Sequence, residues 1–156
     1  HTKWVRISAQ EVVGFQTFMT GEMFDLLAGQ SVLRHVVAGA ELEEAAFDGA
    51  VAALLSRPEA LMRQLFAIRA EATLGQLSPP EARARLSGAL VGAALAAAKG
   101  YRQGMDVAVA AAPALGRLYA RAMAAQGGGV QSHEADPLTQ AGLRFLRGAM
   151  PAGTAP

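Results

Sequence analysis

The clearest alternation of apolar and polar positions lies in the first 20 residues of the chain. Residues 3–8 (KWVRIS) place Val and Ile on one face and Trp, Arg and Ser on the other, and residues 12–20 are rich in Val, Phe and Thr. A period of two with β-branched and aromatic residues is typical of strands. The polar link at 9–11 therefore predicts an antiparallel hairpin.

The pattern changes from strand to helix at Thr20-Gly21-Glu22. Apolar residues then recur with helical spacing at Met23, Phe24, Leu26 and Leu27. Thr is a favoured N-cap residue, and a carboxylate in the first turn suits the helix dipole. We therefore expect Thr20 to cap this helix and Glu22 to lie in its first turn.

Three further helices are predicted in the middle of the chain. One runs over about 41–55, and each of the other two follows a Ser-x-x-Glu capping-box signature with Pro in its first turn, at 56–59 and at 78–81. The last of them is expected to run to Lys99 and to end at Gly100. The helix after residue 56 is expected to turn these side chains inward: Leu61, Met62, Leu65, Phe66, Ile68 and Ala72.

The run over 86–98 is the most apolar part of the chain, but it is shorter than the roughly 20 residues that a bilayer span requires. Within it, Gly88, Gly92 and Ala96 recur at i, i+4 and i+8 on one helix face. Glycine costs about 1 kcal/mol relative to Ala inside a helix, so this spacing indicates a close approach to the backbone. The approaching group is either another helix or strand, or a bound nucleotide lying against a flat wall.

The last third alternates strands and helices. Asp106–Ala112 reads as a buried strand, Pro113 as the start of a helix, and Val130–His133 as a second strand, before a helix with Asp136 at its N-cap. The order predicts an α/β fold in which helices pack on a mixed sheet that includes both the hairpin and the strand at Asp106. We expect one domain over 1–150 and a flexible tail over 151–156.

Composition narrows the function classes. The chain has 156 residues, 52% of them hydrophobic and 17% charged, with a net charge of +1. Scattered Lys and Arg leave no basic patch of the kind that nucleic-acid binding needs. There is no cysteine, which excludes disulfides and thiolate metal sites and agrees with a cytoplasmic location. The histidines, at 1, 35 and 133, do not have metal-ligand spacing.

Several motifs, in order, resemble those of the 2-dehydro-3-deoxygalactonokinases, which are sugar-acid kinases of the actin-like, two-domain ATPase superfamily. The motifs are HTKWV, FMTGEMFDLL, LMRQLFAIRAEATLGQLSP, RLSGALVGAAL and AAPALGRLYARAMAAQG. The resemblance covers most of the chain, but only the second half of such an enzyme. It implies an actin-like, ribonuclease H-like second domain that lacks its first strand and phosphate turn.

The resemblance also implies a site. HTKW is similar to the tail of the phosphate turn, so His1, Thr2 and Lys3 would contact phosphate. Thr20 and Gly21 would face the cleft, and Glu22 would hold Mg²⁺ through water, serve as the base, or only compensate the helix dipole. The segment VAVAAAPAL resembles the adenosine-binding segment, with Ala111 where the family usually has Gly. The residues implied to bind nucleotide are Gly88, Gly92, Ala111, Ala112 and Pro113.

The implied reaction is transfer of the γ-phosphoryl group of Mg-ATP to the 6-hydroxyl of 2-dehydro-3-deoxy-D-galactonate, in galactonate catabolism. The expected partners are the sugar acid, ATP and the absent N-terminal domain, with a homodimer possible and with neither nucleic acid nor membrane. The fragment alone is expected to be inactive, because it holds at most one side of the cleft. The alternative is a noncatalytic α/β interaction domain that binds a partner through its apolar helix or its hairpin edge.

Overall fold

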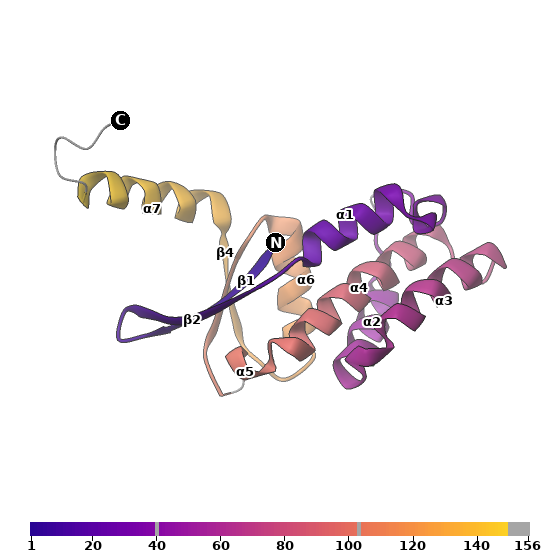
Figure 1. Ribbon diagram of the computed structural model, residues 1–156, viewed down its shortest axis with the longest axis horizontal. Helices are drawn as coiled ribbons and strands as arrows, with labels where there is room; N and C mark the ends of the chain where they lie inside the picture. The colour runs from indigo at the N-terminus through magenta and orange to yellow at the C-terminus, as the bar shows by residue number, and fades with distance from the viewer. Residues whose placement is uncertain (40, 103, 150–156) are drawn as a thin grey trace. The chain divides into compact units, whose positions relative to one another are not determined.

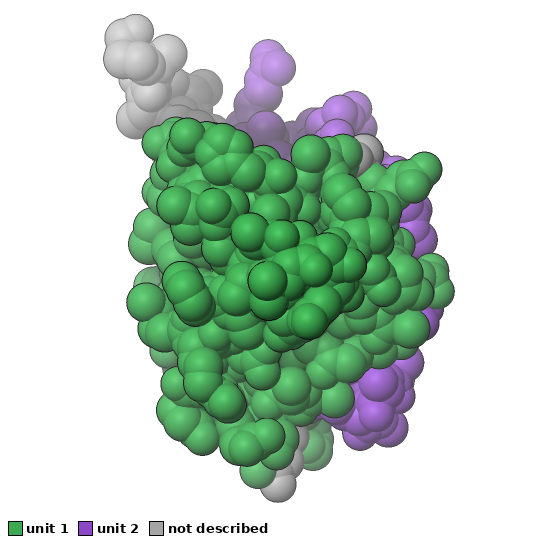
Figure 2. Space-filling model, turned by 90° about the vertical axis from the view of Figure 1, so that its right-hand side faces the viewer, with its two compact units in different colours: residues 1–105 green, residues 106–156 purple. Residues whose placement is uncertain are grey.

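The computed structural model describes residues 1–39, 41–102 and 104–149, and the predicted tail at 151–156 lies outside them. The chain divides into two compact units, residues 1–105 and residues 106–156, which Figure 2 colours separately. Both contain helices and strands, as Figure 1 shows, so the predicted mixed α/β class is confirmed. In the described residues, no helix has the length and apolar character needed to cross a membrane.

The first unit opens with the predicted hairpin. Strands β1 (Thr2–Ser8) and β2 (Glu11–Phe18) pair antiparallel from Thr2 opposite Phe18 to Ser8 opposite Glu11. The turn has only two central residues, Ala9 and Gln10, with φ of 49° and 66°. Positive φ at both positions matches a type I′ turn, whose twist suits paired strands. Arg6 pairs with Gly14 and Ile7 with Val12, so the residue between these partners is a β-bulge.

Helix α1 (Thr20–Gln30) begins directly after the hairpin, as the pattern predicts, and carries Glu22 in its first turn. The capping prediction is wrong. Thr20 is already the first helical residue, and Met19 occupies the N-cap without a side-chain hydrogen bond. The short connection from β2 leaves no extended residue at Thr20 from which a hydroxyl would reach the first-turn amides.

Helix α4 (Pro79–Ala97) is the centre of the first unit, and eleven of its residues are buried. Its capping box forms as predicted: the Ser78 hydroxyl accepts from the Glu81 amide, and the Glu81 carboxylate accepts from the Ser78 amide at 2.7 Å. Around α4 lie α1, the 3-10 helix η1 (Val32–His35), α2 (Glu44–Ser56) and α3 (Leu61–Thr73). One buried cluster joins η1, α3 and α4, with α1 side chains packed against it, and is made of Leu33, Val37, Ile68, Ala82, Leu86 and Leu90.

The two glycines of α4 lie against the backbone of α2. A Cβ added at Gly88 would lie 2.5 Å from the carbonyl oxygen of Phe47, and one at Gly92 would lie 2.7 Å from that of Val51. The predicted close approach is therefore confirmed, and the approaching group is a helix. Of the two alternatives that the spacing leaves open, helix packing accounts for both glycines.

Three details of the helical layer differ from the sequence prediction. Ser56 is the last residue of α2 and not a cap, and the 3-10 turn η2 (Pro58–Ala60) separates it from α3. Met62 and Phe66 are 78% and 71% exposed, because the buried side of α3 centres on Ile68 and one helix face cannot bury every apolar residue. Helix α4 ends at Ala97, and Gly100 lies inside the short helix α5 (Lys99–Arg102).

The second unit alternates strands and helices as predicted. Its elements are β3 (Val107–Ala111), α6 (Pro113–Ala124), β4 (Val130–Glu134) and α7 (Ala135–Ala149). Strands β3 and β4 pair parallel, from Val107 opposite Val130 to Ala111 opposite Glu134. In the described residues they form a sheet of their own, so the prediction of one sheet shared with the hairpin is wrong. Helix α7 begins at Ala135, which leaves Asp136 in the first turn and not at the N-cap.

Candidate functional site

The hairpin brings the start of the chain back to the start of α1. Because Thr2 pairs with Phe18, residue 1 lies beside the β2–α1 junction (Figure 1). There the His1 Nε2 atom lies 3.1 Å from the Glu22 Oε2 atom. A Cβ added at Gly21 would lie 3.8 Å from the His1 nitrogen, which is ordinary van der Waals contact. Segments 20 residues apart in the sequence thus form one cluster.

Of the predicted site residues, His1 lies beside Gly21 and Glu22 here, and Thr2, Lys3 and Thr20 are their neighbours in the sequence. The Lys3 side chain is exposed on the opposite hairpin face from Thr2, and its neighbour across the ladder is Thr17. The side chains of His1 and Glu22 are 56% and 44% exposed, so their contact is largely hydrated. Such a pair adds little stability, which leaves both groups available to a ligand.

The donors of this cluster suit a phosphate group better than a bare metal ion. A hydroxyl, an ammonium and an imidazole can each donate a hydrogen bond to phosphate oxygens. Within the described ranges, no group of three His, Asp or Glu side chains is arranged to hold a metal ion. Mg²⁺ usually keeps several waters and binds one or two carboxylates together with substrate phosphates, so the Glu22 carboxylate fits that mode.

The second unit presents the predicted strand-to-helix turn. Ala111 ends β3, Ala112 is the N-cap of α6 with an extended ψ of 145° and no side-chain hydrogen bond, and Pro113 opens the helix. Ala112 and Pro113 are exposed. No side chain caps the first-turn amides, so they remain available, and the methyl side chain of Ala112 leaves room in front of them.

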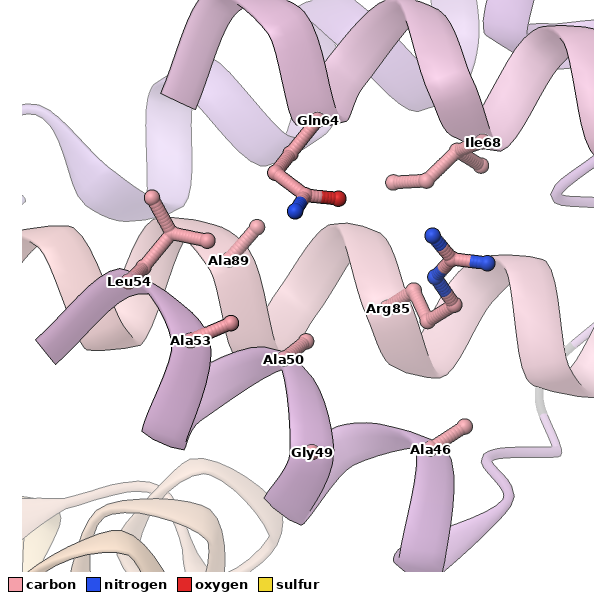
Figure 3. Close-up of a pocket in the computed structure, with 9 residues that line it drawn as sticks. All are labelled: Ala46, Gly49, Ala50, Ala53, Leu54, Gln64, Ile68, Arg85 and Ala89. Carbon is pink, nitrogen blue, oxygen red and sulfur yellow. The ribbon is translucent and has the colours of Figure 1, made fainter. Parts of the chain in front are cut away.

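A separate groove lies between the helices of the first unit. Figure 3 shows Ala46, Ala50 and Ala53 of α2 facing Gln64 and Ile68 of α3, with Arg85 and Ala89 of α4 behind them; Gly49 and Leu54 complete the lining. Its volume is about 270 Å³.

The guanidinium at one end of this groove is already paired. Arg85 binds the Glu71 carboxylate through two of its nitrogens. These hydrogen bonds hold the pKa of Glu71 below its usual value, against the opposing effect of desolvation. With its charge neutralised by Glu71, Arg85 offers little attraction to an anion. The groove therefore holds no catalytic set of residues.

Two features of the structure were not predicted from the sequence. The Arg85–Glu71 pair joins two helices, and its 14-residue separation carries no local signal. Trp4 is buried at 9% exposure, and its indole nitrogen is the only buried side-chain nitrogen or oxygen without a hydrogen-bond partner among the described residues. Alternation along β1 places Trp4 on a face, but it does not show which face is covered.

The chain also matches a known protein family and several known proteins. The family described as DGOK, 2-keto-3-deoxy-galactonokinase, matches residues 1–146. The 2-dehydro-3-deoxygalactonokinase DgoK1 of Rhizobium meliloti (strain 1021) is 40% identical over 147 residues, which are 92% of this chain and 48% of that protein. The 2-dehydro-3-deoxygalactonokinase of Escherichia coli (strain K12) is 32% identical over 151 residues, or 96% of this chain and 51% of that protein.

A crystal structure of a Sinorhizobium meliloti protein with the same enzyme name has a TM-score of 0.86 and 38% identity to this chain. It is matched over 96% of this chain and 51% of its own. The chain therefore spans about half the length of the relatives that it matches. Because the family match extends over nearly the whole sequence, this chain belongs to the 2-keto-3-deoxy-galactonokinase family.

Proposed function

We propose that this chain is the second, nucleotide-binding half of a kinase that phosphorylates 2-dehydro-3-deoxy-D-galactonate at its 6-hydroxyl with ATP. The observation that carries the proposal is the contact at the β2–α1 junction, where His1, followed by Thr2 and Lys3, lies beside Gly21 and Glu22 in a chain of this family. The names of the two curated relatives support the substrate, and the half-length match supports an absent partner domain.

The proposed fold is the second domain of an actin-like ATPase, without its first strand and phosphate turn. Two observations fit this proposal. The hairpin and the β3–β4 pair are each only two strands wide, and two strands are marginal as an independent sheet. The turn at Ala111 to Pro113 joins a strand end to a helix start, which is where open α/β sheets bind ligands.

Each residue of the cluster has a separate role in the proposed site. Lys3 supplies a positive charge and Thr2 a hydroxyl to the phosphate oxygens, and His1 holds one oxygen of Glu22. The other oxygen of Glu22 stays free to accept a proton from the attacking hydroxyl or to bind a water of the hydrated cation. Mg²⁺, when bound with ATP, neutralises phosphate charge. Positioning and charge neutralisation are the main sources of rate in phosphoryl transfer.

The adenosine would lie at the exposed start of α6, where Ala111 and Ala112 allow the backbone to approach and the first-turn amides are uncapped. Gly88 and Gly92 pack against α2, so we assign them to the scaffold and not to the nucleotide.

The proposal is tested with a fusion kinase in which the unmatched half of the Rhizobium meliloti relative precedes His1. Lys3→Ala should lower the turnover number by at least tenfold, whereas Lys99→Ala, in the short helix α5, should leave it within twofold of wild type. A coupled assay of ADP release measures both variants. Wild-type turnover and ATP dependence in Lys3→Ala would remove the role given to the first three residues.

The 156-residue chain gives a second test. We expect it to bind Mg-ADP weakly in calorimetry and not to phosphorylate the sugar acid, since in-line transfer needs both sides of a closed cleft. Absence of nucleotide binding, together with no activity after the other half is added, would favour a noncatalytic interaction domain.

A further inference from the structure

The two faces of the β1–β2 hairpin differ sharply in exposure. Lys3, Val5 and Ile7 of β1 share one face with their β2 partners Thr17, Phe15 and Val12; we call its apolar part, Val5, Ile7, Val12 and Phe15, the bare face. These four side chains are 47%, 62%, 63% and 69% exposed. Apolar residues at successive ladder positions make one continuous patch, and such patches mark interaction surfaces.

The opposite face is covered at one end. Arg6 lies over the Tyr101 ring, with its Cζ atom 5.3 Å from the centroid, and donates to the Gly100 carbonyl oxygen. Trp4, the next residue on that face, is buried at 9% exposure, yet its Nε1–H has no acceptor in the described part of the chain. Buried indole N–H groups usually find a partner.

These two observations are independent, and both indicate that polypeptide is lacking around the hairpin. An apolar face needs a cover, and a buried donor needs an acceptor. A phosphate group would serve Trp4 poorly, because an indole that is already nine-tenths buried leaves little space for a hydrated anion. A carbonyl oxygen of a packed segment is smaller, and it reaches the indole nitrogen once the atoms that cover this nitrogen shift.

The occupant is indicated by the length of the relatives. This chain matches only 48–51% of their lengths, so proteins of this family contain a second half as large as the chain itself. We propose that this second half covers the hairpin: it packs on the bare face, and it supplies the oxygen that accepts the Trp4 Nε1–H bond. The inference rests on the proposed function in one respect: that this chain is the second half, so that the other half precedes it.

The test compares the 156-residue chain with a fusion in which the unmatched half of the Rhizobium meliloti relative precedes His1. Phe15 and Phe66 offer a matched pair, because they are 69% and 71% exposed on different surfaces. In the fusion, Phe15→Lys should lower the melting temperature by several degrees and Phe66→Lys by less than one. In the 156-residue chain both substitutions should have small and similar effects.

The indole N–H resonance of Trp4 provides a second measurement, because Trp4 is the only tryptophan of this chain. With ¹⁵N-labelled tryptophan, its indole N–H resonance should move downfield and exchange more slowly with solvent in the fusion. Any tryptophan of the added half is assigned by comparison with a Trp4→Phe fusion. An indole signal that already has these properties in the 156-residue chain would show that the acceptor lies within this chain and would overturn the inference.

Other outcomes are equally decisive. If Phe66→Lys destabilises the fusion as much as Phe15→Lys, the contact is not made by the bare face. If the 156-residue chain alone sediments as a dimer that Phe15→Lys dissociates, the occupant is a second copy. Should the fusion not fold, the halves are co-expressed as two chains, and failure to co-purify also overturns the inference. A fusion that covers the hairpin but lacks kinase activity counts only against the proposed function.

Discussion

Substituting Gly88 or Gly92 with alanine should destabilise the protein, although alanine is the better helix former. The added methyl carbon would lie 2.5 Å from the Phe47 carbonyl oxygen at position 88 and 2.7 Å from that of Val51 at position 92. Both contacts are with backbone atoms, which no side-chain rotation can relieve. Helices α2 and α4 would have to separate along the contact that gives α4 much of its burial.

The size of the effect follows from two opposing contributions. Removing a glycine from a helix interior stabilises by up to about 1 kcal/mol. Overpacking a close contact costs about 1–3 kcal/mol, and more where the backbone must move. We therefore expect a net loss of about 1–2 kcal/mol for each variant, which for a domain of this size lowers the melting temperature by roughly 2–8 °C.

Gly49 is the matched control. It lies within helix α2, and an added Cβ would meet no atom within 4 Å, so Gly49→Ala has the helix-propensity gain without the collision. Urea unfolding followed by circular dichroism at 222 nm should show Gly49→Ala more stable than wild type and the two α4 variants less stable. If all three variants were stabilised alike, the close packing of α2 on α4 would be refuted.

Four further substitutions test local features by the same unfolding assay. Ser78→Ala should lower the free energy of unfolding by about 1 kcal/mol because it breaks the capping box. Ser56→Ala, at a helix end, should leave that free energy within about 0.5 kcal/mol of wild type. Equal losses would mean that both serines are caps. Gln10→Gly should stabilise by about 0.5–1 kcal/mol, since glycine tolerates φ of 66° without strain, and a loss of stability would argue against the two-residue turn. Glu71→Gln should lose no more than about 1 kcal/mol at pH 7, because the pair with Arg85 is partly exposed. Since hydrogen bonding lowers the pKa of Glu71 in the folded state, this loss should shrink as the pH falls below the ordinary glutamate value of about 4.3, and a loss that stays constant on acidification would contradict that origin.

Local sequence patterns predicted the helix and strand features that depend only on neighbouring residues. The alternation over residues 3–8 is a property of one strand, and the Ser78–Glu81 box needs only four consecutive residues, so both predictions are confirmed. The same signature at Ser56 failed because α2 continues through that serine. A capping motif shows that a helix start is possible at a residue, whereas tertiary packing decides where the preceding helix ends.

Features that depend on distant parts of the chain were predicted less completely. The glycine spacing in α4 predicted a close approach but not its partner, because α2 lies some 40 residues earlier in the chain. The division of strands between two sheets depends on pairing across the whole chain. For the candidate site, the hairpin alone placed residues 1–3 beside residues 20–22, so that cluster followed from local pattern once the register was known. The unpaired Trp4 indole has no sequence signal.

The packing around α4 also has a consequence for the order in which the first unit forms. Helices α1, α2 and α3, which all contact α4, precede it in the chain, and these contacts close shorter loops than the one that holds the hairpin. The hairpin is held to α5 through Arg6 and Gly100, which are 94 positions apart. Because contacts between distant residues slow folding, we expect the helical layer to assemble first, with docking of the hairpin as the late step.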